Sequence, residues 1–314
     1  IVMPPLSLPN HLRAALCATA LLAACGSSPL PPSSATPLAP ASKWVSSWGA
    51  ATSSAFPSSY NVDATTRSNT AGSERSLRLM ARTTLGGSAV RIRLTNAFGQ
   101  TPLNIGSAHV ALRQTGASLV PGSSWPVTFD GAASTVIAAG AQVVSDPVPL
   151  ATLAGEDVAV SLYLPGAVLT PSIHAQAFQT NFVSPNNSGD VTAEESGTSF
   201  TGLNSSVPVL EGIDVLATEN AGAIVVLGDS LSDGVGSTFD GFDRWPDQLA
   251  RRLQAANIPR AIVNAGLTGN SIDCAIGVPQ DGPDAVERLD RDVLSKAGIS
   301  AVLLFEGTND LANF

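Results

Sequence analysis

The sequence predicts two domains, an all-β sandwich or jelly roll over residues 44–218 and an α/β domain over residues 219–314. Residues 44–218 contain short stretches in which apolar and polar residues alternate, with recurring turn signals and no long helical pattern. From residue 219, short apolar strands alternate with amphipathic helices, which is typical of a parallel sheet with right-handed crossovers. A length of 314 residues is enough for about two domains.

Residues 1–24 are predicted to form a signal peptide. An apolar stretch, residues 14–24, is too short to span a bilayer as a stable helix and is followed by small residues. It ends in Leu22-Ala23-Ala24-Cys25, which resembles a bacterial lipobox, and Cys25 would then be the acylated N-terminus of a lipoprotein. The alternative is an ordinary secretory signal with an incidental cysteine.

The segment after Cys25 is predicted to be a tether, residues 25–43. It is dominated by Pro, Ser and Ala and has no apolar periodicity, so it cannot bury enough surface to fold. We expect an exported protein that is lipid-anchored to the bacterial cell envelope, and otherwise a secreted or periplasmic one. Ser27 and Ser28 follow the cysteine without an Asp directly after it, which by resemblance to Gram-negative lipoproteins favours the outer membrane.

Alternating residues predict the strands of the β domain. Leu77, Leu79 and Ala81 share one face of a strand over residues 76–84, and a turn at Gly86-Gly87 leads to a second strand. The other expected strands are residues 90–94, 105–112, 126–129, 135–138, 142–145, 158–164 and 213–217. Residues 44–51 fit either this domain or a strand that packs on the later one.

The α/β domain is predicted from three apolar strands and two helices between them. The first two strands lie at residues 224–227 and 261–266, and the third is the stretch of residues 299–310. The stripe of the first helix is Trp245, Leu249 and Leu253, with Pro246 in its first turn. The stripe of the second helix is Val286, Leu289, Val293 and Ala297, closed by Gly298, with Asp284 or Asp281 as its cap. Glu287, Asp290 and Asp292 are interpreted as its solvated face rather than as catalytic acids.

Small and polar residues follow each of the three strands. The first strand ends in Gly228-Asp229-Ser230, the second in Gly266, and the third in Gly307-Thr308-Asn309-Asp310. The carboxyl ends of parallel strands meet at one edge of a sheet, so these residues should converge. Gly228 lets the chain turn sharply and leaves the Ser230 hydroxyl approachable, as a nucleophile requires. The alternative is that Ser230 or Asp229 serves only as the N-cap of a helix.

The three blocks together resemble those of the GDSL, or SGNH, hydrolases. Gly228-Asp229-Ser230-Leu231 matches the first block, Gly266 the second, and Gly307-Thr308-Asn309-Asp310 the third. The resemblance implies a flavodoxin-like three-layer α/β/α domain and ester hydrolysis through an acyl-serine, with Ser230 as nucleophile. It also implies an oxyanion hole made by the N–H groups of Ser230 and Gly266 and the side-chain amide of Asn309. Related SGNH hydrolases carry a comparable β-rich domain ahead of the catalytic one.

A serine nucleophile needs a base, and the resemblance implies a late Asp-x-x-His block that the 314 residues do not contain. We therefore expect an incomplete α/β core with an exposed apolar sheet edge, and an inactive chain as given. His11 lies in the signal peptide. His109 and His174 lie in the β-rich stretch and are interpreted as structural or surface histidines.

Other polar residues near the blocks have mostly structural interpretations. Asp229 either hydrogen-bonds the nucleophile loop or forms the turn, Asp233 is a loop cap, and Asp310 stabilises its own turn. Gly228 and Gly307 support the site as close-approach glycines. Cys274 is free or pairs with something outside this sequence.

Composition excludes some classes of function. The 16 basic and 25 acidic residues give a net charge of −9, which argues against nucleic-acid binding through a basic face. No His and Cys cluster has metal-ligand spacing, so neither metal nor cofactor is predicted. Two functions remain open: an ester hydrolase acting on small or carbohydrate-borne acyl groups, and a catalytically silent, surface-tethered carbohydrate-binding lipoprotein. In the first, the protein contacts the membrane through its lipid anchor, and the β domain shapes access to the active site or binds a polymer.

Overall fold

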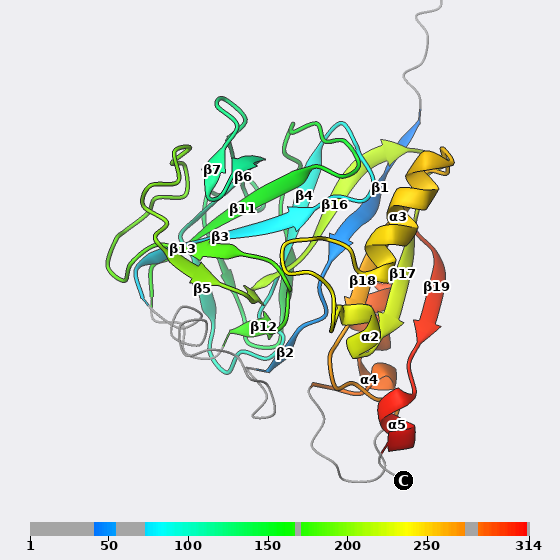
Figure 1. The fold of residues 1–314 in the computed structure, drawn as a ribbon. Coiled ribbons are helices and arrows are strands. Elements are labelled where there is room, and N and C mark those ends of the chain that lie inside the picture. The colour runs from blue at the N-terminus through cyan, green and yellow to red at the C-terminus, as the bar shows by residue number, and fades with distance from the viewer. Residues whose placement is uncertain (1–40, 55–72, 167–170, 274–281, 313–314) are drawn as a thin grey trace, which may run out of the picture. The chain divides into compact units, whose positions relative to one another are not determined.

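The computed structural model describes residues 41–54, 73–166, 171–273 and 282–312 (Figure 1). They fall within one unit, Pro40–Phe314, so the β-rich and α/β parts of the chain pack together. The predicted signal peptide, most of the tether with Cys25, and the residues Cys274 and Asp281 lie outside the described residues. No helix in the described ranges is long and apolar enough to cross a membrane.

Two antiparallel sheets dominate the β-rich part. The first has the order β1 (Ser42–Gly49), β16 (Leu210–Thr218), β4 (Val90–Thr95) and β10 (Gln142–Val144). The second has the order β14 (Gly202–Asn204), β13 (Asn181–Val183), β3 (Arg75–Arg82), β11 (Asp157–Leu164), β6 (Ser107–Thr115) and β7 (Ser118–Leu119), with β8 (Trp125–Pro126) beside β6.

Short strands complete this part of the chain. One small sheet contains β15 (Val207–Pro208), β12 (Ser172–His174) and β2 (Ser53–Ser54), and another pairs β5 (Leu103–Ile105) with β9 (Thr135–Ile137). Apolar side chains of the two larger sheets, such as Leu79 of β3 and Ile92 of β4, belong to one buried cluster. The prediction of a β-rich region ahead of the α/β part is therefore confirmed.

The strands before and after the predicted turn at Gly86-Gly87 do not pair with each other. Strand β3 pairs with β11 and β13, whereas β4 pairs with β16 and β10, so the chain crosses from one sheet to the other between them. Gly87 forms a bridge with Thr152, and a Cβ on Gly87 would lie 2.8 Å from the carbonyl oxygen of Leu216. The glycine therefore serves a close backbone approach rather than a tight two-strand turn.

The α/β part is built on a three-stranded parallel sheet with the order β18-β17-β19. Its strands are β17 (Gly222–Gly228), β18 (Arg260–Gly266) and β19 (Ile299–Phe305), which confirms the predicted parallel sheet. The helices are α2 (Ser230–Asp233), α3 (Trp245–Ala255), α4 (Ala285–Leu289), a π-helical turn (Asp290–Leu294) and α5 (Thr308–Ala312).

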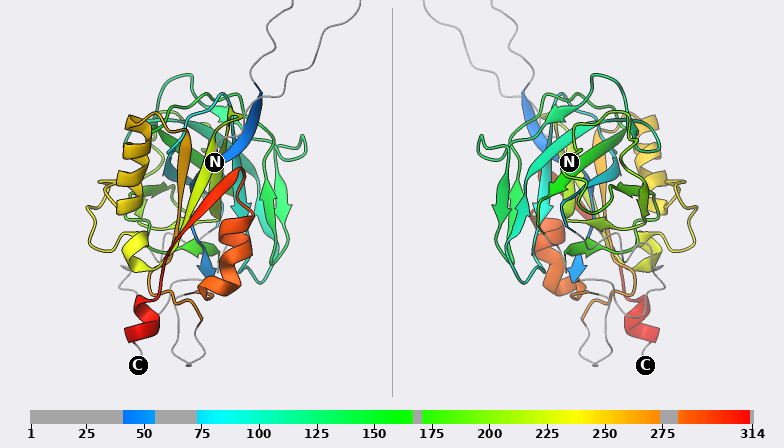
Figure 2. Two further views of the ribbon diagram at one scale, coloured as in Figure 1. Left: turned by 90° about the vertical axis from the view of Figure 1, so that its right-hand side faces the viewer. Right: turned by 90° about the vertical axis from the view of Figure 1, so that its left-hand side faces the viewer.

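The two faces of this sheet are covered differently. Helix α3 packs its predicted stripe, Trp245, Leu249 and Leu253, around Val226 and Ile262. On the opposite face, side chains of β17 and β18 share a core with the π-helical turn and with Val45 of β1. Figure 2 shows α3 and α4 on opposite sides of the sheet. Strand β1 thus belongs to the first β-sheet and also packs on the α/β part, which answers the question left open for residues 44–51.

The second predicted helix differs from its expected pattern. Leu289 and Val293 face the core as predicted, but Val286 is 60% exposed. The helix changes to π geometry at Asp290, where the Ser295 N–H bonds to the Asp290 carbonyl at 2.9 Å, and this shifts the angular spacing of its side chains. The interpretation of Asp292 as solvated is wrong, because it is buried between two arginines, whereas Glu287 and Asp290 are exposed.

Strand β19 has the exposed apolar character that the sequence predicted for the sheet edge. It pairs with β17, and Val302, Leu303, Leu304 and Phe305 are between 38% and 64% exposed.

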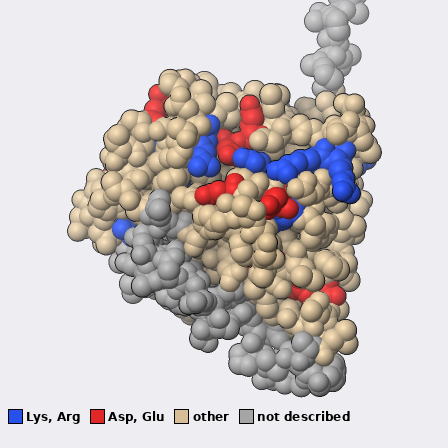
Figure 3. Space-filling model, in the orientation of Figure 1, with Lys and Arg blue, Asp and Glu red and all other residues tan. Residues whose placement is uncertain are grey.

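On the face in Figure 3, basic side chains form a band flanked by acidic ones instead of covering the face.

Candidate active site

The turn that holds Ser230 begins where β17 ends. Asp229 is the N-cap of α2, and its Oδ1 accepts a hydrogen bond from the Leu231 N–H at 2.9 Å. Ser230 is partly exposed at the first position of the helix. A Cβ on Gly228 would lie 2.2 Å from the Ser232 hydroxyl oxygen, so the chain can turn this sharply only with glycine there. Asp229 therefore both forms the turn and hydrogen-bonds the loop of the proposed nucleophile, so both of its interpretations hold.

Gly266 ends β18 directly against α2. A Cβ at this position would lie 2.4 Å from the backbone nitrogen of Asp233, so again only glycine fits. The Gly266 N–H donates to Oδ1 of Asn264 at 2.9 Å, and the Asn264 amide donates to the Ser232 carbonyl at 2.7 Å. Asn264 therefore ties the end of β18 to the helix that carries Ser230.

The third block follows β19. The Asn309 amide donates to the carbonyl oxygen of Asn270 at 2.6 Å. Asp310 accepts hydrogen bonds from the N–H groups of Ile272, at 3.0 and 3.1 Å, and of Asp273, at 3.4 Å. The prediction that Asp310 stabilises its own turn is thus corrected, because its carboxylate binds the loop after β18. Gly307 has a φ of 112°, which favours glycine.

The register of the sheet brings the three blocks to one edge. Gly228 is level with Gly266 on one side and with Phe305 on the other. The predicted convergence of the three strand ends is therefore confirmed.

A histidine from the β-rich part contacts the helix of Ser230. His174 Nε2 lies 3.1 Å from Oδ1 of Asp233, and its Nδ1 lies 2.8 Å from the carbonyl oxygen of Ala51. A carbonyl oxygen and a carboxylate only accept hydrogen bonds, so both ring nitrogens donate and the ring is an imidazolium. Burial lowers the pKa of His174, but the charge and hydrogen bond of Asp233 and the bond to Ala51 outweigh it and raise that pKa above its usual value.

Asp233 is more than the predicted loop cap. Its second oxygen, Oδ2, accepts from the N–H and the hydroxyl of Thr268 at 2.8 and 2.6 Å, so it does hold the loop after β18. Its first oxygen pairs with His174. The sequence offered no signal for this pair, because its members lie 59 positions apart in different parts of the chain.

Arg288 and Glu306 form a buried charged group beneath the strand ends. The Arg288 guanidinium lies 3.1 Å from Oε1 of Glu306, and both side chains are fully buried. Burial raises the pKa of Glu306, Arg288 opposes this, and the negative charge of Asp229 adds to the rise, so that the pKa reaches about 7. Oε2 of Glu306 and Oδ2 of Asp229 are buried and accept no hydrogen bond from the described part of the chain.

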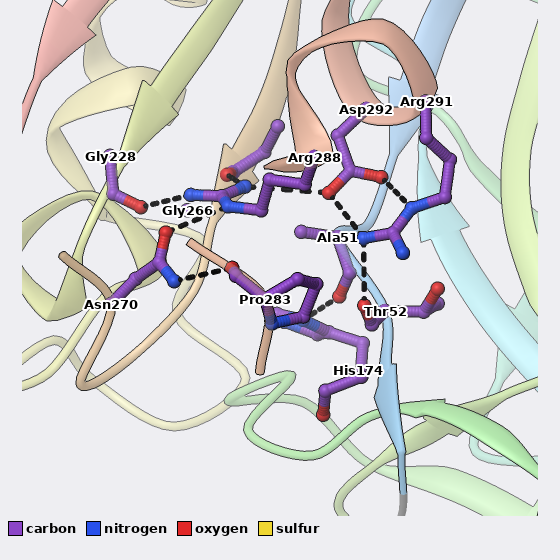
Figure 4. A network of polar contacts seen from close by, with 12 residues as sticks. Ala51, Thr52, His174, Gly228, Gly266, Asn270, Pro283, Arg288, Arg291 and Asp292 are labelled. Carbon is purple, nitrogen blue, oxygen red and sulfur yellow. Dashed lines mark hydrogen bonds and ion pairs between the residues drawn. The ribbon is translucent and has the colours of Figure 1, made fainter. Parts of the chain in front are cut away.

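These polar contacts connect the strand ends to the β-rich part (Figure 4). Asp292 joins Arg288 to Arg291, whose Nη2 donates to the Thr52 carbonyl at 3.0 Å. The next residue towards the N-terminus, Ala51, accepts from His174. Within the described ranges, no group of three or more His, Cys, Asp and Glu side chains is placed to hold a metal ion.

Comparison with known proteins agrees with this geometry. Residues 226–313 match the model of the GDSL-like Lipase/Acylhydrolase family, to which this part of the chain is therefore similar. No curated protein matches the chain.

Similar solved structures include two esterases. The chain is 22% identical to AlinE4, an SGNH-hydrolase family esterase, over 31% of this chain and 46% of that one, with a TM-score of 0.25. It is 12% identical to a family two carbohydrate esterase from Clostridium thermocellum in complex with cellohexaose, over 78% of this chain and 62% of that one, with a TM-score of 0.24. The chain therefore spans less than two thirds of the length of either structure.

Proposed function

We propose that the protein is a serine ester hydrolase that acts through an acyl-serine intermediate on small or carbohydrate-borne acyl esters. One observation carries the proposal: the sheet register places Ser230, Gly266 and the Asn309 segment at one edge, with Ser230 on a strand–turn–helix that only glycine allows. The match of residues 226–313 to GDSL-like acylhydrolases supports the reaction class. The proposal includes a flavodoxin-like domain, which the strand order β18-β17-β19 favours.

The proposed reaction has two halves. The Ser230 hydroxyl oxygen attacks the ester carbonyl carbon while a base removes its proton, and a tetrahedral oxyanion forms. The base then protonates the leaving alcohol, and water releases the acid from the acyl-serine by the same steps. The N–H groups of Ser230 and Gly266 and the Asn309 amide would stabilise the oxyanion. Because the Gly266 N–H donates to Asn264 in the structure, the oxyanion would have to replace or share that acceptor.

The proposal assigns the base to neither histidine of the described residues. His174 donates through both ring nitrogens and therefore has no lone pair with which to accept the Ser230 proton. His109 lies in β6, and its Nδ1 is 3.1 Å from the Thr192 hydroxyl oxygen.

The test is substitution of the nucleophile. In the full-length protein, Ser230→Ala should abolish hydrolysis of 4-nitrophenyl acetate, with a loss on the order of several powers of ten in kcat, and should abolish labelling by a fluorophosphonate. Ser232→Ala is the matched control, because that hydroxyl is fully buried on the same helix. Equal hydrolysis by wild type and a folded Ser230→Ala protein would exclude the assignment. A wild type that neither hydrolyses esters nor takes the label would favour the silent binding lipoprotein.

We further propose that the protein is exported and anchored to the cell envelope through a lipid on Cys25. Support comes from the apolar stretch that ends in Leu22-Ala23-Ala24-Cys25. Wild type should partition into the detergent phase, and Cys25→Ser should not. Recovery of a processed wild type wholly in the aqueous phase would favour simple secretion.

A further inference from the structure

Arg288 is a fully buried cation with an acceptor for each of its five N–H donors. Nε donates to Oδ1 of Asn270 at 2.7 Å. Nη1 donates to the Ala265 carbonyl at 2.6 Å and reaches Asp292 at 3.4 Å. Nη2 donates to the Gly228 carbonyl at 3.0 Å and to Glu306 at 3.1 Å. Burying a guanidinium is costly unless it is paired in this way, so five separate groups must stay in place around it.

Three of these acceptors lie on the segments that carry the proposed oxyanion donors. Gly228 is two residues before Ser230, and Ala265 directly precedes Gly266. Glu306 is three residues before Asn309, at the end of β19. Arg288 therefore bonds at once to the ends of all three strands of the parallel sheet, and Figure 4 shows its contact with Gly228.

The fourth acceptor leads directly to Asn309. The Asn270 side chain is fully buried, accepts from Arg288 and donates to the Pro283 carbonyl at 2.8 Å. Its own backbone carbonyl accepts from the Asn309 amide at 2.6 Å. The orientation of the Asn309 amide thus depends on a residue that Arg288 holds from below.

We propose that Arg288 is the positioning residue of the site, which sets the Ser230, Gly266 and Asn309 donors relative to one another without touching the substrate. This inference rests on the proposed function. Oxyanion stabilisation depends on donors held within a few tenths of an ångström, so loosening the strand ends should slow the chemical step more than it weakens substrate binding.

The neighbouring arginine provides a matched control. Arg291 belongs to the same polar network and pairs with the same Asp292, but its other acceptor is the Thr52 carbonyl of the β-rich part. Lysine keeps the charge at either position but has three donors at a single point and cannot replace the planar fork. If Arg288 were important only for stability, Arg288→Lys and Arg291→Lys would lower activity in proportion to their loss of thermal stability.

We expect Arg288→Lys to lower kcat for 4-nitrophenyl acetate by about 10²-fold, with KM within about twofold of wild type. Arg291→Lys should retain kcat within about threefold. The double variant Arg288→Lys/Asn309→Ala should lose less than the product of the two single-variant losses, because Arg288 acts partly through that amide. A kcat loss shared equally by both lysine variants, or fully additive losses in the double variant, would overturn the proposal.

A second measurement does not depend on hydrolysis. The Asn309 side-chain amide signal, assigned by its loss in Asn309→Asp, should be protected from hydrogen exchange in wild type and in Arg291→Lys, but not in Arg288→Lys. If wild type hydrolyses no ester, the function fails while this measurement still decides whether Arg288 orders Asn309. If Arg288→Lys does not fold, Asn270→Ala removes one arm of the network and should give the same kcat loss and the same loss of protection. Unchanged values in a folded Asn270→Ala protein would refute the relay.

Discussion

The contact between His174 and Asp233 predicts how the stability of the protein depends on pH. Both side chains are more than nine-tenths buried, and His174 joins β12 of the β-rich part to α2 of the α/β part. His174→Phe keeps a ring of similar size but leaves the Asp233 oxygen and the Ala51 carbonyl without their donor. Removing one partner of a buried ion pair costs about 3 to 5 kcal/mol, so we expect this loss near pH 6 and a melting temperature lower by on the order of 10 °C.

The sign of the pH effect follows from the raised pKa of His174. A histidine whose folded-state pKa is raised stabilises the protein fully below its unfolded pKa of about 6.5, and this contribution is lost as the pH rises through the folded value. The difference in unfolding free energy between wild type and His174→Phe should therefore be largest near pH 6 and should shrink towards pH 9. Urea titrations at about half-unit intervals of pH measure this difference.

His109→Phe is the matched control, because it changes a histidine whose pKa shifts the other way. Burial lowers the pKa of His109, the charge of Asp190 opposes this, and Arg78 adds to the lowering. Its neutral form therefore stabilises the protein above about pH 6.5, and this stabilisation is lost as the pH falls. The two variants should show opposite slopes against pH. A His174→Phe effect that is flat with pH, or that grows towards alkaline pH, would refute the assignment of a buried imidazolium.

Three further predictions concern the strand ends. Asn309→Ala should lower kcat by about 10²- to 10³-fold, the scale for one oxyanion donor, and a change confined to KM would make Asn309 a substrate-binding residue instead. Wild type should lose stability as the pH rises from about 4.5 through about 7, because the Glu306 pKa is raised to about 7. Glu306→Gln should remove this dependence of the unfolding free energy on pH, which urea titrations measure. Gly266→Ala should destabilise the protein strongly in thermal melts, because the new methyl group would overlap the Asp233 backbone, and an unchanged melting temperature would contradict that close approach.

Local patterns in the sequence were enough to predict the elements that local physics determines. The stripe of Trp245, Leu249 and Leu253 depends only on helical spacing, and the apolar runs that end in Gly228 and Gly266 depend on burial in a parallel sheet. The same patterns were misleading where a distant partner decides. Asp292 follows the spacing of a solvated face, yet it is buried because Arg288 and Arg291 neutralise it.

The candidate site shows the same division between local and distant causes. Ser230, Gly266 and Asn309 could be selected because they lie at the ends of predicted strands and match the blocks of the resemblance, and the register places these strand ends side by side. Arg288, Glu306 and the His174–Asp233 pair carry no local signal, because their partners come from segments far apart in the chain. A single charged residue in a helix cannot be recognised as buried until the acceptors around it are known.

The contacts of β1 indicate what the β-rich part contributes to the hydrolase-like part. The Ser46 N–H donates to the Ala297 carbonyl at 2.9 Å, and Val45 lies in one buried cluster with Val225 and Val263 of the parallel sheet. Thr84, from the segment after β3, accepts from the Ile262 N–H and donates to the Ile262 carbonyl, each at 3.0 Å, so it occupies backbone groups at the outer side of β18.

The β-rich part therefore covers one face and one edge of the sheet that ends at Ser230. A parallel sheet needs apolar cover on both faces, and an open strand edge invites unwanted pairing. In this chain α3 covers one face, whereas α4, the π-helical turn and β1 share the other. His174 then reaches from the same part to α2, so the region that covers the sheet also holds the helix of the proposed nucleophile. The β-rich part therefore has a structural role in the packing of the proposed site.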